Sequence, residues 1–202
     1  MPKLALALVI LVTLVPSVFA DTIYSNGPIN GTTDAWAINF GFAVSDTFTL
    51  STAATFSDFS FGAWLTPGDV LIDAEVLIGT SEFGGTLTDQ VVNFTQSDCS
   101  GNQYGYNVCV ETGRLAPVNL AAGTYWLTLQ NATVNTGDPV YWDENSGPSS
   151  ASENSVGTIP SEAFTLNGCC GPPTTPEPSS MLLFASGVMS LFATGVYKRF
   201  RP

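Results

Sequence analysis

No histidine occurs among the 202 residues of the chain. Serine and cysteine triads therefore lose their usual general base, and His-ligated metal sites are excluded. The chemistry that remains is that of a carboxylate pair, which cleaves glycosidic bonds when two acids face each other about 5 to 10 Å apart across a cleft.

Asp143 and Glu144, in the segment VYWDENSGPSSASENS, are the best candidates for such a pair. Consecutive residues of a strand point to opposite faces, so one of the two would need a partner from elsewhere, for example Asp138 or Glu153. Any acidic β protein shows scattered carboxylates of this kind. We therefore expect no catalytic residue and no enzymatic activity, and we keep a carboxylate-dependent glycosidase as an alternative.

Aromatic side chains suggest a second kind of chemistry, the stacking of sugar rings. In GTYWLTL, Tyr125 and the leucines that follow share one face of a strand, so Trp126 points to the other. Together with Tyr141 and Trp142 it could form an exposed platform for a glycan. The alternative is a Trp126 covered by a loop, since tryptophan is highly buried on average.

The charge of the chain is concentrated in its middle. All 17 acidic residues lie between Asp21 and Glu177, where Arg114 is the only basic residue, so this segment carries a net charge of −16. Such a segment offers no basic surface for phosphates, which excludes nucleic acid as a partner and disfavours anionic membrane surfaces. Calcium, which takes carboxylate and carbonyl oxygens, stays open as a ligand. No other metal or cofactor is expected.

The four cysteines point to an oxidising compartment. Cys99 and Cys109 bracket a short polar loop, and Cys169 and Cys170 are adjacent. Four cysteines allow three pairings, but the short separation favours a Cys99–Cys109 disulfide. The pairing of the other two is left open. Zinc is excluded by the spacings and by the missing histidine.

Strand patterns fill the region between the two ends of the chain. In WAINFGFAV the large residues Trp36, Ile38, Phe40, Phe42 and Val44 alternate with smaller ones, which predicts one strand with Phe40 and Phe42 in the core and Asn39 on the opposite face.

Further strands are expected on both sides of TPGD and of a Gly84–Gly85 turn, and in YNVCVET, AAGTYWLTLQNATV, PVYWDE and EAFTLNG. Short alternating strands without helices between them predict an all-β, antiparallel sandwich or jelly roll. We expect it to form a single domain over residues 21–168.

The N-terminal residues have the pattern of a secretory signal peptide. A basic Lys3 precedes an apolar run from Leu4 to Val15, and small residues at Val18 and Ala20 suit cleavage after Ala20. A membrane anchor would need roughly 20 apolar residues, and this run stops at Pro16. Residues 1–20 are therefore predicted to be removed during export.

The C-terminal residues have three parts. A Pro-rich spacer at 169–175 precedes Pro176-Glu177-Pro178, an apolar stretch predicts a transmembrane helix over 180–197, and a basic stub (Lys198, Arg199, Arg201) follows. Basic residues stay on the cytoplasmic side, so the stub acts as a membrane stop. A permanent anchor and a sorting signal both fit this order.

This tail resembles the PEP-CTERM sorting signal of Gram-negative bacteria through its order of Pro-Glu-Pro, short apolar helix and basic end. The resemblance implies an exosortase as partner, cleavage near the motif, and passage of the domain from the inner membrane toward the cell surface or the extracellular space. Such proteins are typically associated with exopolysaccharide and biofilm. A GPI signal is the alternative for the tail, but it normally ends without a basic stub.

The central region also resembles all-β domains found before such tails, through DAWAINFGFAVSDTFTL at 34–50 and the segment 122–149. This likeness implies a fold and no site residues. We therefore expect an exported structural or binding protein of the surface or matrix, with a carbohydrate-binding module as the first alternative.

Overall fold

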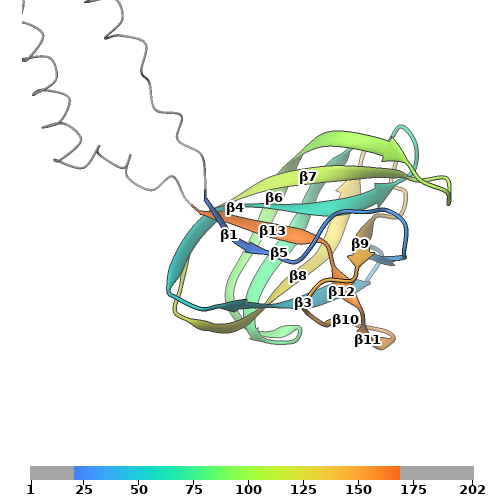
Figure 1. The fold of residues 1–202 in the computed structure, drawn as a ribbon. Helices are drawn as coiled ribbons and strands as arrows, with labels where there is room; N and C mark the ends of the chain where they lie inside the picture. Colours follow the sequence, from blue (N-terminus) through green and yellow to red (C-terminus); the bar gives the residue numbers. More distant parts are fainter. Residues whose placement is uncertain (1–20, 169–202) are drawn as a thin grey trace, which may run out of the picture. The chain divides into compact units, whose positions relative to one another are not determined.

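The computed structural model describes residues 21–168, and the predictions for the signal peptide, the spacer, Cys169, Cys170, the Pro-Glu-Pro motif, the apolar helix and the basic stub lie outside them. Within the described residues there are strands and turns but no helix (Figure 1). The strands are β1 (Thr22–Ser25), β2 (Ala35–Ala37), β3 (Ala43–Leu50), β4 (Ala54–Leu65), β5 (Leu71–Ser81), β6 (Gly84–Gly101), β7 (Asn107–Leu120), β8 (Gly123–Val134), β9 (Tyr141–Asn145), β10 (Ala151–Glu153), β11 (Gly157–Ile159), β12 (Ser161–Glu162) and β13 (Phe164–Gly168). Over residues 21–168, nothing in the fold has the length and apolar character of a membrane-crossing helix.

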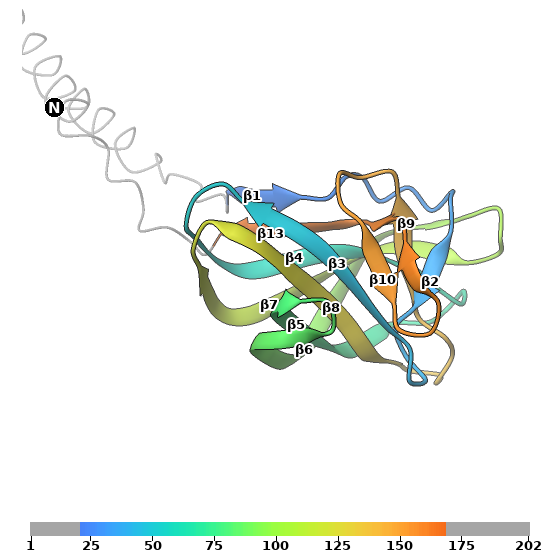
Figure 2. The same cartoon turned by 90° about the horizontal axis from the view of Figure 1, so that it is seen from below.

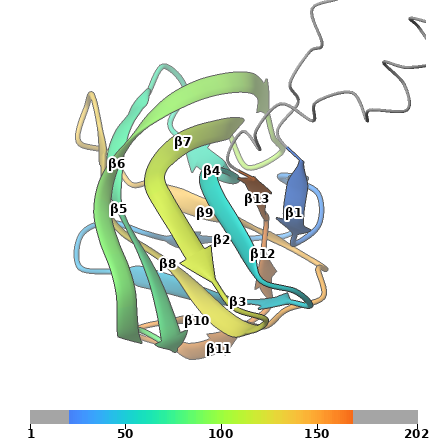
Figure 3. The same ribbon diagram turned by 90° about the vertical axis from the view of Figure 1, so that its left-hand side faces the viewer.

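All the strands join one antiparallel sheet. Its main path runs β1-β13-β4-β7-β6-β5-β8-β3-β10-β11, and β9 pairs with β2, β4 and β12 beside that path. β6 links the two halves of the sheet, because its first part pairs with β5 and its second part with β7. Figure 3 shows the strong curvature of the long strands that results.

The curl brings the two halves of the sheet around a shared core. Phe48 of β3 packs on Phe56 of β4 and on Phe164 of β13, with ring centroids 6.3 Å apart in both pairs. The expectation of an antiparallel all-β domain is thus confirmed. The separate sheets of a sandwich or jelly roll stay a finer prediction, because the pairing joins every strand in one sheet.

The predicted strand over residues 36–44 is wrong in its middle. Ile38 and Val44 are fully buried as expected, but Phe40 is 66% exposed, Phe42 is 40% exposed, and Asn39 is buried instead. The chain makes a turn here, with Phe40 in the left-handed region at φ 56° and the Phe42 N–H donating to the Asn39 carbonyl. A turn resets the alternation, so both phenylalanines point outward.

The hairpin between β5 and β6 differs in a smaller way. Its turn residues are Glu82 and Phe83, with Phe83 at φ 49°, whereas Gly84 and Gly85 already belong to β6. Gly79 leaves room for this arrangement, because a Cβ there would lie 2.1 Å from the Gly84 carbonyl oxygen. The tip of the hairpin therefore closes tightly.

Candidate functional site

The strands β2 and β9 and the β10–β11 hairpin lie close together at one end of the domain (Figure 2), and side chains from this region line an open groove. It has a volume of about 340 Å³. We call it the aromatic groove and define it by its lining, which is Ala35, Trp36, Ala37, Phe40, Phe42, Pro139, Tyr141, Glu153, Ser155 and Val156. Four of these ten residues are aromatic, and polar groups are few, which is the composition expected of a small-ligand site.

The turn at residues 38–42 creates one wall of the groove. The Asn39 amide donates to the Asp138 carbonyl at 3.0 Å, and its Oδ1 accepts from the Val140 N–H at 3.2 Å. These bonds replace the pairing that a continuous strand would have made. As a result Phe40 and Phe42 leave the core and line the groove, and Phe40 also borders a second hollow beside Asp138.

Trp36 lines the groove and is held by a carboxylate. Its indole N–H donates to Glu144 Oε2 at 2.9 Å, and Glu144 is itself only 6% exposed. The ring is therefore fixed before any ligand arrives, which lowers the entropic cost of stacking a ligand on it.

Tyr141 connects the groove to a longer run of aromatic rings. Its ring contacts Tyr106 with centroids 5.5 Å apart, Tyr106 contacts Trp64, and Trp64 stacks on Tyr104 at 5.4 Å. Burial, followed by the neighbouring Tyr106 hydroxyl, raises the pKa of Tyr141, so its hydroxyl keeps its proton at neutral pH. Tyr141 thus offers both a ring face and a hydrogen-bond donor.

Glu153 borders the groove as a buried side chain that shapes the β10–β11 turn. Its Oε2 accepts from the Ser155 N–H at 3.0 Å, the Ser155 hydroxyl at 2.6 Å and the Val156 N–H at 3.1 Å, which shapes the β10–β11 turn. Its Oε1 is buried and has no protein partner. Because Glu153 is only 3% exposed and its Oε1 is enclosed by protein atoms, the residue shapes the edge of the groove and does not present this oxygen to a ligand.

The predicted platform of Trp126, Tyr141 and Trp142 is not assembled. Trp142 is fully buried, packs on Phe61 and Phe164, and donates its indole N–H to the Ala163 carbonyl. Its role as an exposed platform residue is therefore wrong. Side chains alternate along β9, so the strand that buries Trp142 turns Tyr141 outward. In the groove, Tyr141 is accompanied by Trp36, Phe40 and Phe42, which the sequence pattern assigned to the core.

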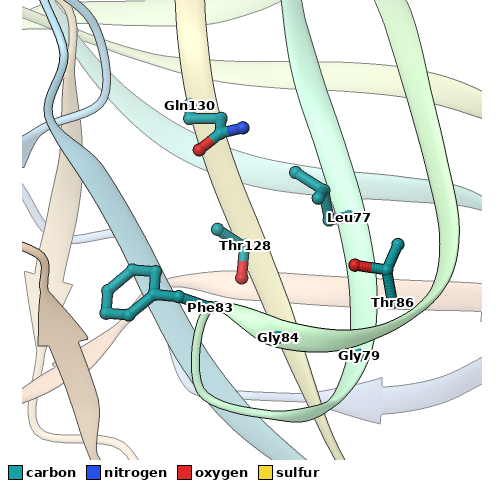
Figure 4. A pocket seen from close by; sticks show the side chains of 7 residues that line it. All are labelled: Leu77, Gly79, Phe83, Gly84, Thr86, Thr128 and Gln130. Carbon is teal, nitrogen blue, oxygen red and sulfur yellow. The ribbon is translucent and has the colours of Figure 1, made fainter.

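Trp126 lies on β8, in the other half of the sheet, and is half-buried. The outer face of β8 next to it carries a small pocket of about 80 Å³, which is lined by Leu77, Gly79, Phe83, Gly84, Thr86, Thr128 and Gln130 (Figure 4). The tip of the β5–β6 hairpin lies over this face. This pocket is much smaller than the aromatic groove, whose volume is about 340 Å³.

Asp143 of the predicted carboxylate pair acts as a buried acceptor. It accepts from the Asn30 N–H at 2.8 Å, the Gly31 N–H at 2.9 Å and the Trp64 indole at 2.6 Å. Burial raises its pKa, and these hydrogen bonds oppose the rise. Gly62 provides the space, because a Cβ at that position would lie 2.8 Å from the Asp143 Cβ. Asp143 therefore fixes the 28–31 loop, and Glu144 fixes Trp36.

Two further features concern metal ligands and the cysteines. In residues 21–168, no three acidic or cysteine side chains are grouped so that they could hold a metal ion. The predicted disulfide is confirmed, because Cys99 and Cys109 are bonded across the β6–β7 hairpin.

Comparison with known proteins identifies the tail. The family model of the PEP-CTERM protein-sorting motif matches residues 174–199, which include Pro176, Glu177 and Pro178 and the stub residues Lys198 and Arg199. The chain therefore carries a PEP-CTERM sorting signal, which implies an exported, membrane-anchored precursor and an exosortase as its processing partner. None of the curated proteins searched matches the chain.

Proposed function

We propose that this chain is the precursor of a surface or matrix protein that an exosortase releases from the inner membrane and that binds extracellular polysaccharide through its aromatic groove. The sorting motif at residues 174–199 carries the first half of the proposal. The groove, with its four aromatic side chains and a Trp36 ring held in place by Glu144, supports the second half.

The sorting half depends on an enzyme reading the Pro-Glu-Pro sequence. If the tail were a permanent anchor, only its apolar stretch and the stop formed by Lys198, Arg199 and Arg201 would matter. Replacing residues 176–178 with three alanines leaves both of these features unchanged, so the variant separates the two functions of the tail.

The experiment is fractionation of cells that contain the cognate exosortase. We expect the native protein to be recovered outside the inner membrane and shortened by about the mass of the tail, and the triple-alanine variant to remain full-length in the membrane. Equal size and equal fractionation of the two proteins would refute processing at this motif.

The second half of the proposal predicts which class of polysaccharide binds. Trp36 and Tyr141 offer ring faces to a sugar, and the protonated Tyr141 hydroxyl offers a hydrogen-bond donor. The strongly negative domain repels acidic chains. We therefore expect neutral or amino-bearing polysaccharides to bind and uronic-acid polymers to be excluded.

A glycan array tests this half directly. Tyr141→Ala is expected to lose most of the binding, because the substitution removes the aromatic ring on which a sugar ring would stack. Trp126→Ala is the matched control, since this half-buried aromatic lies in the other half of the sheet. Equal binding by the two variants would refute the groove as the site, and an inert native domain would favour a purely structural role.

We propose no enzymatic activity for the domain. Support comes from Asp143, whose carboxylate accepts three hydrogen bonds, and from Glu144, which binds the Trp36 indole. Hydrolysis of a polysaccharide by the native protein that disappears in Glu144→Gln would reinstate the glycosidase.

A further inference from the structure

Asn26, the residue that follows β1, is held rigidly in the interior. Its side chain is fully buried, its backbone N–H donates to the Phe164 carbonyl at 2.8 Å, and its carbonyl accepts from the Asn145 amide at 2.8 Å. The side chain therefore has a single orientation, toward β3, β12 and the loop after β9.

The side-chain amide of Asn26 is surrounded by too many oxygens. Its Nδ2 lies 2.6 Å from Ser149 Oγ and 2.8 Å from each of Asp46 Oδ2, Ser161 Oγ and the Glu162 carbonyl oxygen. An amide nitrogen carries two protons and accepts no hydrogen bond. The carboxylate and the carbonyl can only accept, so when they take the two protons, both serine oxygens face the amide with lone pairs.

The remaining groups around this amide have the properties of an acyl-transfer site. The Tyr24 hydroxyl donates to Asn26 Oδ1 at 2.7 Å, where negative charge would develop if an oxygen attacked Cγ. Burial and the nearby Asp46 raise the pKa of Tyr24 to about 12, which keeps this hydroxyl a donor.

Asp46 provides the base. It is fully buried, its Oδ2 lies 2.8 Å from Asn26 Nδ2, and its Oδ1 has no hydrogen-bond partner and is free to take a proton; burial raises its pKa to about 6, and the neighbouring polar groups, Ser149 foremost, oppose this rise. The group is therefore mostly ionised at neutral pH and is placed to take the proton of the Ser149 hydroxyl. Ser161 Oγ lies 2.9 Å from Ser149 Oγ and positions it.

We propose that Ser149 and Asn26 react with each other in the folded protein and form an intramolecular ester cross-link. Asp46 removes the proton from Ser149 Oγ, and the oxygen attacks Asn26 Cγ, whose carbonyl oxygen is held by Tyr24. The C–N bond then breaks, and Asp46 returns its proton to the leaving nitrogen. One molecule of ammonia leaves, no oxidant or reductant is needed, and the crowding of four oxygens around one nitrogen is relieved.

The bond would join residues that are 123 positions apart, one directly after β1 and the other in the loop between β9 and β10. It is independent of the Cys99–Cys109 disulfide, which closes a loop of separation 10 within the first part of the chain. Arg114 makes the two cross-links easy to distinguish, because it is the only lysine or arginine between Lys3 and Lys198.

The test is a tryptic digest of the purified full-length protein after denaturation and reduction. Cleavage after Arg114 gives one fragment that contains Asn26 together with both disulfide cysteines, and a second that contains Ser149 and Ser161. We expect the two fragments to remain joined, with the summed mass lowered by one ammonia, and to separate after brief mild alkali, which hydrolyses esters.

Variants assign the reacting groups. Ser149→Ala and Asp46→Asn are expected to give two separate fragments with no loss of ammonia, whereas Ser146→Ala, at an exposed serine of the same loop, stays joined. Near-ultraviolet circular dichroism reports whether each variant is folded, and the native digest decides the question even if the Asp46 variant is not.

Three results would overturn the proposal. Separate native fragments of unaltered mass exclude the reaction, and a joined product mapped to Ser161 excludes Ser149 as the nucleophile. Loss of ammonia without joining would indicate ring closure of Asn26 onto Gly27, and hence no ester.

Discussion

Replacing Glu111 with glutamine is expected to remove part of the pH dependence of the free energy of unfolding. Glu111 lies on β7, directly opposite Phe61 of β4, and is fully buried. Neither of its carboxylate oxygens has a hydrogen-bond partner in the protein. Burial raises its pKa from 4.5 to about 8, because the interior disfavours the charged form.

The sign of the effect follows from proton binding. Between pH 4.5 and pH 8 the folded protein keeps a proton on Glu111 that the unfolded chain has lost, so the free energy of unfolding decreases as the pH rises. The stabilisation is complete below pH 4.5. Raising the pH from 4.5 to 7 therefore lowers the free energy of unfolding by about 3 kcal/mol, at about 1.4 kcal/mol for each pH unit.

The assay is urea unfolding of the native protein and of Glu111→Gln at pH 4.5 and pH 7, followed by tryptophan fluorescence. The loss of unfolding free energy between the two pH values should be about 3 kcal/mol smaller in the variant. This difference of differences cancels the constant cost of burying an amide, and it also cancels the titration of Asp46 and Glu162, whose pKa values burial raises too. Glu82→Gln, at an exposed position, is the control.

An equal loss in the native protein and the Glu111 variant would refute the reasoning. It would mean that Glu111 ionises in the folded state at neutral pH, and hence that water or a counter-charge reaches it.

Three further changes test the fold. Asn39→Ala should lower the free energy of unfolding by about 1 to 3 kcal/mol, because it leaves the Val140 N–H and the Asp138 carbonyl unpaired. Phe40→Ala, at an exposed position, should lower it by less than about 1 kcal/mol in the same assay. The reverse order would favour the continuous strand. Asp143→Ala should cost about 3 to 5 kcal/mol, since three donors lose their acceptor, and a near-neutral result by thermal unfolding would show that water replaces it. Reduction of Cys99–Cys109 should lower stability by about 2 to 3 kcal/mol for a loop of separation 10, and an unchanged denaturation midpoint would contradict this.

Alternation along the chain predicted the strands well but not the turn at residues 38–42. On β8 the inward Leu127 and Leu129 and the half-buried, outward Trp126 follow the period of two. The same period fails at Asn39, because a buried amide bonded to residues 99 and 101 positions away fixes a turn where hydrophobicity alone favours a strand. Local patterns cannot report such distant partners.

The candidate site could be predicted only in part, for a related reason: the sequence pattern indicates Tyr141 as a site residue but assigns Trp36, Phe40 and Phe42 to the core. Tyr141 and Trp142 are adjacent and both aromatic, and only the pairing of β9 with β2 and β4 decides which of them is buried. The disulfide needed no such information, because its two cysteines are close in sequence and face each other across one hairpin. The Asn26 contacts, in contrast, join four segments that no sequence pattern connects.

The position of β13 determines when the exported domain can complete its fold. β13 ends at Gly168, yet it lies inside the sheet between β1 and β4, and β1, the first strand of the chain, has β13 as its only strand partner in the described residues (Figure 1). During synthesis a chain emerges from its N-terminus, so β1 must wait for nearly the whole domain before it can pair. The segment that follows β13 in the chain is the sorting signal. The sheet can therefore close only after the chain has been made as far as Gly168, a few residues before the sorting motif begins at residue 174.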